Sequence, residues 1–173
     1  MMPVRYYAGF HSSAQARNTR RSTNSWFATC SCFFGDVLKD PTLESPTSSG
    51  SLRRDLTFRN AADGGPWCDW KRAHEIHAVL IECKNKEKLT HDDLRQTAGY
   101  LGPTMGRLGI LACRKTTADE VRDMLNWFVS NDHKYILVVN DESLVDWIRM
   151  KDRGGNPTDA IADLYRSLRE GVG

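Results

Sequence analysis

The chain has 173 residues and a mass of 19.6 kDa, a size that fits one domain. Hydrophobic residues make up 40% of it and charged residues 27%, which predicts a packed core and excludes wholesale disorder. The longest apolar run, residues 135–139, is far shorter than the ~20 residues of a membrane-spanning helix, so no membrane partner is expected. The net charge of +2 does not by itself indicate a nucleic-acid-binding protein.

The N-terminal segment differs in composition from the rest of the chain. Residues 1–35 contain Arg5, Arg17, Arg20 and Arg21 but no aspartate or glutamate. We expect residues 1–22 to form a basic, disordered arm and residues 23–173 to form the folded domain. The composition fits an arm that touches phosphates, a solvated tail, an organellar transit peptide or a misread start.

The cysteine content indicates a reducing compartment. The five cysteines are odd in number and irregular in spacing, and none form a C-x-x-C pair. This pattern supports neither a zinc site nor a disulfide framework. We therefore expect reduced, mostly buried thiols in a cytoplasmic protein.

The first half of the chain predicts one helix and two strands. Apolar residues at helical spacing predict a helix over residues 24–38 with Asn24 as its cap, followed by a loop over residues 40–50. Residues 52–59 alternate in polarity, and residues 77–83 are almost continuously apolar, so both predict strands. The segment between them, residues 63–70, is rich in turn residues and is expected to form a turn-centred connection.

The second half alternates helix and strand. Thr90 and Asp93 have the spacing of a capping box, which predicts a helix from there to Tyr100 or Leu101. Further helices are expected over residues 117–129, 142–152 and 157–169, and further strands over residues 108–113 and 135–139. The pattern predicts an α/β fold, with a mixed sheet, flanking helices and parallel later strands.

The segment Ile81-Glu82-Cys83-Lys84-Asn85 carries the most chemical information. On a strand Glu82 and Lys84 project to one face while Cys83 projects to the other. A carboxylate and an ammonium at the end of so apolar a strand cost free energy unless something compensates them. A divalent cation on Glu82 and an anionic substrate at Lys84 would do so.

A second carboxylate is expected from the neighbouring strand. If residues 52–59 and 77–84 pair in antiparallel fashion about a turn centred between Cys68 and Asp69, Asp55 lies directly across from Glu82. Their Cβ atoms would then be ~5 Å apart on one face. Asp63 and Asp69 are the rival acids, but they fall inside the connection, so we favour Asp55.

These groups predict a metal-assisted reaction at phosphate. Asp55, Glu82 and the backbone carbonyl of Cys83 are hard oxygen ligands suited to Mg²⁺, with Mn²⁺ as a substitute. Lys84 would add a point charge for the phosphate or orient the attacking water. Gln96 and Tyr100 share a helix face, from which Gln96 could contact Lys84 or a metal-bound water and Tyr100 a substrate phosphate.

Residues 50–140 resemble the PD-(D/E)xK, or restriction-endonuclease-like, nuclease superfamily. The resemblance rests on Asp55 followed by Glu82-Cys83-Lys84. Gln96-Thr-Ala-Gly-Tyr100 is similar to the Gln-x-x-x-Tyr helix of the RecB-type and lambda-exonuclease-type branch, and Asn85 after the lysine recurs in Mrr-like proteins. It implies a restriction-endonuclease-like core and a Mg²⁺-dependent nuclease, with Asp55 and Glu82 as metal ligands, Lys84 as the catalytic lysine and Gln96 as an accessory active-site residue.

The expected substrate is DNA, with RNA and the choice between endonuclease and exonuclease left open. The groups expected to contact nucleic acid flank the site: Arg53, Arg54, Asn85, Lys86 and Tyr100. A homodimer or a larger defence complex would suit a restriction or defence effector. Residues 24–35 lack the acid that the family's first helix commonly supplies, which motivates an alternative: a catalytically degenerate module that binds nucleic acid or a protein partner.

Overall fold

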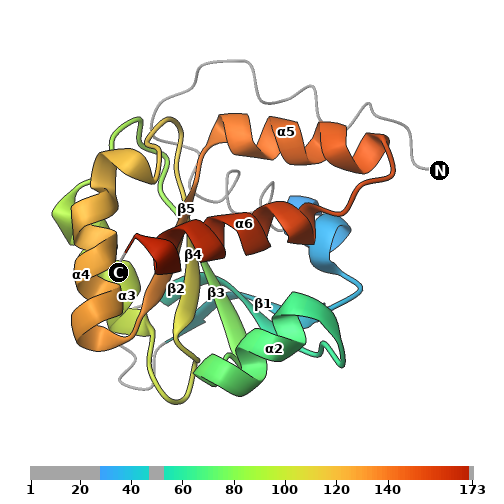
Figure 1. Ribbon diagram of the computed structural model, residues 1–173, viewed down its shortest axis with the longest axis horizontal. Helices are drawn as coiled ribbons and strands as arrows, with labels where there is room; N and C mark the ends of the chain where they lie inside the picture. Colours follow the sequence, from blue (N-terminus) through green and yellow to red (C-terminus); the bar gives the residue numbers. More distant parts are fainter. Residues whose placement is uncertain (1–27, 47–52, 172–173) are drawn as a thin grey trace.

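A computed structural model of the chain describes residues 28–46 and 53–171. These residues form a five-stranded sheet flanked by helices, which confirms the predicted α/β class and mixed sheet (Figure 1). The spatial order of the strands follows the sequence: β1 (Leu38–Pro46), β2 (Arg53–Asn60), β3 (Ala78–Cys83), β4 (Leu108–Ala112) and β5 (Tyr135–Val139). The expected arm, residues 1–22, lies outside the described residues. Among the described helices, none has the length and apolar character needed to cross a membrane.

Strands β1 to β3 are antiparallel neighbours, and β3 to β5 are parallel neighbours, as predicted for the later strands. Parallel strands need crossover connections. Here α3 (His91–Tyr100) joins β3 to β4, and the 3-10 turn η3 (Asp119–Val121) with α4 (Arg122–Asp132) joins β4 to β5. Two helices close to their predicted ranges, α5 (Asp141–Asp152) and α6 (Pro157–Glu170), complete the fold.

Strand pairing assigns each side chain to one of two faces of the sheet. Glu82 and Leu80 lie on the face covered by α3, here called the α3 face. The α3 helix approaches this face closely, since a Cβ atom on Gly109 of β4 would lie 3.3 Å from Leu101. Tyr135 lies on the opposite face, where its ring is 5.2 Å from that of Tyr165 on α6, so we call it the α6 face.

Aromatic side chains fill the core on the α6 face. The ring of Phe34, in the helical segment 28–34, lies 5.9 Å from Trp67 and 6.0 Å from Trp147. Trp147 is 3% exposed and Tyr165 is 5% exposed, so both belong to the core. Figure 1 shows α6 crossing this face in front of the strands, with α5 above it and α2 below.

The N-terminal half departs from the prediction at two elements. The first helix ends at residue 34 rather than 38, and its predicted cap Asn24 lies outside the described residues. The expected loop over residues 40–50 is wrong, because residues 38–46 form the edge strand β1. This strand carries a bulge between Lys39 and Thr42, with Asp40 at φ 51° and Pro41 beside it. An edge strand tolerates proline because one row of its N–H groups needs no partner, and bulges make turn residues acceptable.

The connection between β2 and β3 is also not the turn that was predicted. Residues 65–74 form α2 (Gly65–His74), which starts with Pro66 in its first turn and buries Trp67, Cys68 and Trp70. Asn60 at the end of β2 fastens this helix. Its side-chain amide donates hydrogen bonds to the carbonyls of Trp67 (2.9 Å) and Ile76 (3.0 Å).

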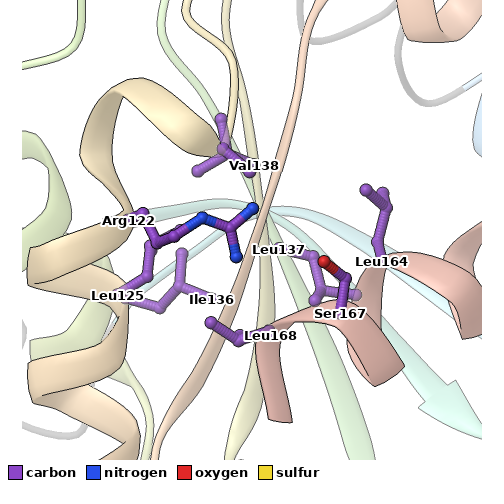
Figure 2. A pocket seen from close by; sticks show the side chains of 9 residues that line it. Arg122, Leu125, Ile136, Leu137, Val138, Leu164, Ser167 and Leu168 are labelled. Carbon is purple, nitrogen blue, oxygen red and sulfur yellow. The ribbon is translucent and has the colours of Figure 1, made fainter. Parts of the chain in front are cut away.

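The far edge of the sheet, at β5, is flanked by α4 and α6. Figure 2 shows Arg122 reaching from α4 across this edge, between Val138 and Ile136 and toward Ser167 of α6. The guanidinium pairs with Asp119. Covering the edge in this way limits pairing with strands of other molecules.

Candidate active site

The β2–β3 hairpin brings the two predicted carboxylates together. Leu56 pairs with Ile81 and Arg59 with Ala78, which is the predicted register, and one further step sets Asp55 opposite Glu82. The backbone N–H of Asp55 lies 3.5 Å from Glu82 Oε2. The connection contains a helix rather than a turn, yet the register is unchanged.

Asp69, the rival acid, is on the exposed side of α2. It lines a surface depression with Tyr165 and Arg169 of α6, so it lies on the α6 face of the sheet, opposite to Glu82. The structure keeps Asp55, not Asp69, beside Glu82.

Lys84 lies directly beyond the end of β3, on the same face as Glu82. Its backbone N–H donates to the carbonyl of Ala112 at 2.7 Å, which extends the ladder with β4. Its ammonium Nζ lies 3.0 Å from Glu82 Oε1 and 2.9 Å from Gln96 Oε1. The Lys84 side chain is 15% exposed and that of Glu82 is 3% exposed, so the cluster opens to solvent mainly through Lys84.

Helix α3 supplies Gln96 and Tyr100, as predicted from their spacing. Gln96 Nε2 donates to the Tyr100 hydroxyl at 2.9 Å, while Gln96 Oε1 accepts from Lys84. The amide therefore has its oxygen toward the lysine and its nitrogen toward the tyrosine. Tyr100 is 5% exposed, and its observed contact is one that orients Gln96.

The start of α3 is held by an interaction that sequence reasoning only partly found. The predicted capping box is present: Thr90 and Asp93 exchange hydrogen bonds between side chain and backbone. In addition, Lys86 Nζ lies 2.8 Å from Asp93 Oδ1, and Asp93 is 5% exposed. A basic residue four positions before the first residue of a capping box is the signal that could have found this ion pair.

Like charge and burial govern the electrostatics of the cluster. Burial raises the pKa of Glu82, the nearby Asp55 carboxylate raises it further, and Lys84 offsets part of this rise. A buried carboxylate beside a second carboxylate is stabilised by any cation that reaches both. Lys84 alone does not cancel the rise in the pKa of Glu82, so the charged form of this carboxylate remains disfavoured.

The oxygen donors of Asp55 and Glu82 fit Mg²⁺, because a divalent cation stabilises two neighbouring carboxylates. Among the described residues no group of three or more histidine, cysteine, aspartate or glutamate side chains could hold a metal. Mg²⁺ does not need such a cage, because it is commonly bound through one or two carboxylates and keeps several waters. Asp55 and Glu82 would hold it, with the backbone carbonyl of Cys83 as the predicted third ligand.

The residues predicted to contact nucleic acid do not all lie at this cluster. Arg54 projects to the face opposite Asp55, and its Nε is buried without a hydrogen-bond partner among the described residues. Asn85 is exposed and accepts a hydrogen bond from Arg114 at 3.4 Å. Lys86 is committed to Asp93 through the pair described above, although its side chain is half exposed. The side chain of Arg53 lies outside the described part of the structure.

Comparisons of the chain with protein-family models, with curated proteins and with solved structures find no match. The case for a function therefore rests on the geometry of Asp55, Glu82, Lys84 and Gln96.

Proposed function

We propose that the protein is a Mg²⁺-dependent nuclease that hydrolyses phosphodiester bonds, with DNA as its substrate and a restriction-endonuclease-like core. One observation carries this proposal. Two adjacent carboxylates, a lysine and a glutamine form a continuous contact network at the ends of β2 and β3. Asp55 on β2, Glu82 and Lys84 at the end of β3 and Gln96 on α3 are also the residues on which the resemblance to the PD-(D/E)xK superfamily rests.

Each side chain of the network has a role that its contacts support. Asp55 and Glu82 would hold the cation, which when bound supplies positive charge next to the phosphate and lowers the pKa of a coordinated water. The Lys84 ammonium lies beside the Glu82 carboxylate and would stabilise the negative charge that develops on phosphate oxygens. Gln96 fixes the ammonium through its carbonyl oxygen, so the lysine is oriented before substrate arrives.

The setting proposed with this activity is a cytoplasmic restriction or defence effector, which acts as a homodimer or inside a larger complex. Four of the five cysteines, Cys30, Cys68, Cys83 and Cys113, are free and buried, as expected for reduced thiols. Either assembly would supply the sequence recognition for which the chain has no evident motif.

A second candidate is a degenerate nuclease fold that binds nucleic acid or a protein without cleavage. The observation that favours it is that the cluster has two carboxylates, with no group of three such metal-ligating side chains among the described residues. Calorimetric titration with Mg²⁺ and Mn²⁺ separates the two candidates. The nuclease requires a cation site that Asp55→Ala abolishes, whereas the degenerate module has no such site.

The primary test is cleavage of linear duplex DNA, covalently closed circular DNA and RNA, each with Mg²⁺, Mn²⁺ or EDTA. We expect metal-dependent cleavage of DNA that is lost in Lys84→Ala. Cleavage of the closed circle would define an endonuclease, and cleavage of linear DNA alone an exonuclease. A purified, folded protein that cuts none of these substrates with either metal would refute the proposal.

A further inference from the structure

A second charged feature lies at the other end of β2. Between the end of β2 and the C-terminal turn of α2 the surface forms a depression, here called the β2–α2 depression. It is lined by Arg59, Asn60, Lys71, Arg72, Glu75 and His77.

The acids near the depression leave it with excess positive charge. Glu75 pairs with Arg107 at 3.7 Å, and Asp40 pairs with Arg59 at 2.6 Å. The Lys71 ammonium instead donates to the backbone carbonyls of Ala62 (2.6 Å) and Asn60 (3.4 Å). Because those carbonyls carry no net charge, the positive charge of Lys71 remains.

Arg72 adds a second cation to this depression. It is exposed on α2, and its guanidinium makes no hydrogen bond or ion pair with other residues in the described part of the chain. Arginine binds phosphate oxygens through two parallel N–H groups, so this geometry of free donors suits a phosphate.

An open strip of polar side chains connects the depression to the carboxylates. Asp55, Thr57 and Arg59 alternate along β2 on the α3 face, and Thr42 and Lys39 of β1 pair with the last two of them. Thr42, Lys39 and Arg59 are exposed. Asp55 and Arg59 are four strand positions apart, which spans about 13 Å. This length corresponds to roughly four nucleotides of a B-form strand.

We propose that the β2–α2 depression is a phosphate-binding subsite for the nucleic-acid strand that the candidate active site engages. This inference rests on the proposed function for the identity of its ligand. The strand would run along the polar strip, with backbone phosphates contacting the threonine hydroxyls and then Arg72 and Lys71. Such contacts position a strand without reading its sequence.

A structural role for the same residues predicts a different result. Lys71 and Arg72 lie in the last turn of α2, where basic side chains favourably offset the negative end of the helix dipole. If that were their whole role, their replacement would change stability and leave nucleic-acid binding unaffected.

The test measures binding of labelled single-stranded DNA of about 4 and about 12 nucleotides to the full chain in EDTA, across a series of salt concentrations. Arg72→Gln is compared with Arg153→Gln, which removes the same charge at the C-terminal end of α5. We expect the wild type and Arg153→Gln to bind the longer strand more tightly than the shorter one. Arg72→Gln should lose several-fold of that gain, and its slope of log K against log salt should fall by about 0.7. Equal behaviour of the two variants would overturn the subsite.

The same series separates this inference from the proposed activity. DNA cleavage by a protein whose Arg72→Gln variant binds both lengths normally would overturn the subsite and leave the nuclease proposal standing. Length-dependent binding that requires Arg72, in a protein that cleaves nothing, would support the subsite and refute the nuclease. Repeating the series with RNA of the same lengths shows which nucleic acid provides the phosphates.

Discussion

The carboxylate of Asp55 accepts a 2.8 Å hydrogen bond from the backbone N–H of Cys83. This bond joins β2 to β3 at the residue between Glu82 and Lys84, so it fixes the Asp55 side chain beside Glu82. Two carboxylates are thus held together where burial already disfavours their charge. The arrangement sacrifices stability of the isolated chain, as is common at functional sites.

Asp55→Asn tests this arrangement directly. Asparagine keeps the shape and can still accept from the Cys83 N–H, but it removes one of the two negative charges. In EDTA we expect the variant to unfold at the same temperature as wild type or a few degrees above it. Added Mg²⁺ should raise the unfolding temperature of wild type and not that of the variant.

Asp69→Asn is the matched control, because Asp69 is exposed on α2, on the α6 face of the sheet and not on the face that carries the cluster. It should respond to Mg²⁺ as wild type does. A normal response in Asp55→Asn beside a lost response in Asp69→Asn would overturn the site assignment.

Lys84→Met should separate catalysis from cation binding. Methionine retains most of the aliphatic stem but loses the ammonium that contacts Glu82 and Gln96. We expect loss of DNA cleavage by a factor of about 100 or more, with calorimetric Mg²⁺ binding retained. Loss of both together would mean that Lys84 acts only through Glu82.

Lys86→Met is the control for Lys84→Met, since the two lysines are two residues apart and differ in partner. Lys86 pairs with Asp93 and holds the start of α3. We expect a loss of about 1 kcal/mol in the free energy of unfolding, measured by urea titration, with cleavage retained. Equal loss of cleavage in both variants would argue for a general effect of surface charge.

The stability of the α3 cap should depend on pH through Asp93. Burial alone would raise the pKa of Asp93, but hydrogen bonds from Lys86 and Thr90 outweigh it and lower the pKa below the ordinary value of 3.8. The native state therefore binds the proton less well than the unfolded chain. The stabilisation is complete above pH 3.8 and is lost as the pH falls through the lowered pKa.

Asp93→Asn removes this titration and should cost about 1 kcal/mol at neutral pH. Urea unfolding of wild type and variant between about pH 6 and pH 3 measures the difference. We expect the two stabilities to converge at the acid end of this range. A difference that stays constant with pH would show that Asp93 does not carry the effect.

Asn60→Asp should destabilise the fold more than any change at the surface. The Asn60 amide donates to two carbonyls and its oxygen accepts from the N–H of Ala62, all in a buried position. A carboxylate cannot donate to either carbonyl, so we expect a loss of about 2–4 kcal/mol by chemical denaturation. Thr57→Val, three residues earlier on the partly exposed side of β2, should change stability by less than about 1 kcal/mol. Equal losses in the two variants would show that Asn60 does not fasten α2.

Local sequence rules predicted most of the second half of the chain. The capping box at Thr90, the apolar strands 108–112 and 135–139 and Pro157 at the start of α6 each act within a few residues, so neighbours in the sequence are enough to specify them. The same is true of the alternation in β2. Alternation put Asp55 and Thr57 on one face, and side-chain period fixes that assignment wherever the strand lies in the sheet.

The pairing of Asp55 with Glu82 was within reach of the sequence because two antiparallel strands joined by one connection have few sensible registers. The sequence did not reveal that a helix fills the connection between β2 and β3. The turn residues Gly64, Gly65 and Pro66 start α2 rather than a hairpin loop, since Trp67 and Trp70 find a hydrophobic core contributed by α6 and by residues 28–34. That core exists only after distant segments have packed.

Tertiary structure alone decided two features that position the candidate site. Strand β1 forms because β2 offers an edge to pair with, and its prolines read locally as a loop. Lys86 is held by Asp93 rather than free to bind phosphate, which depends on where α3 docks. The sequence thus determined which residues carry the chemistry and which face they share, because side-chain period is local. Packing decided what covers them and which charges remain unpaired, because both depend on segments far apart in the chain.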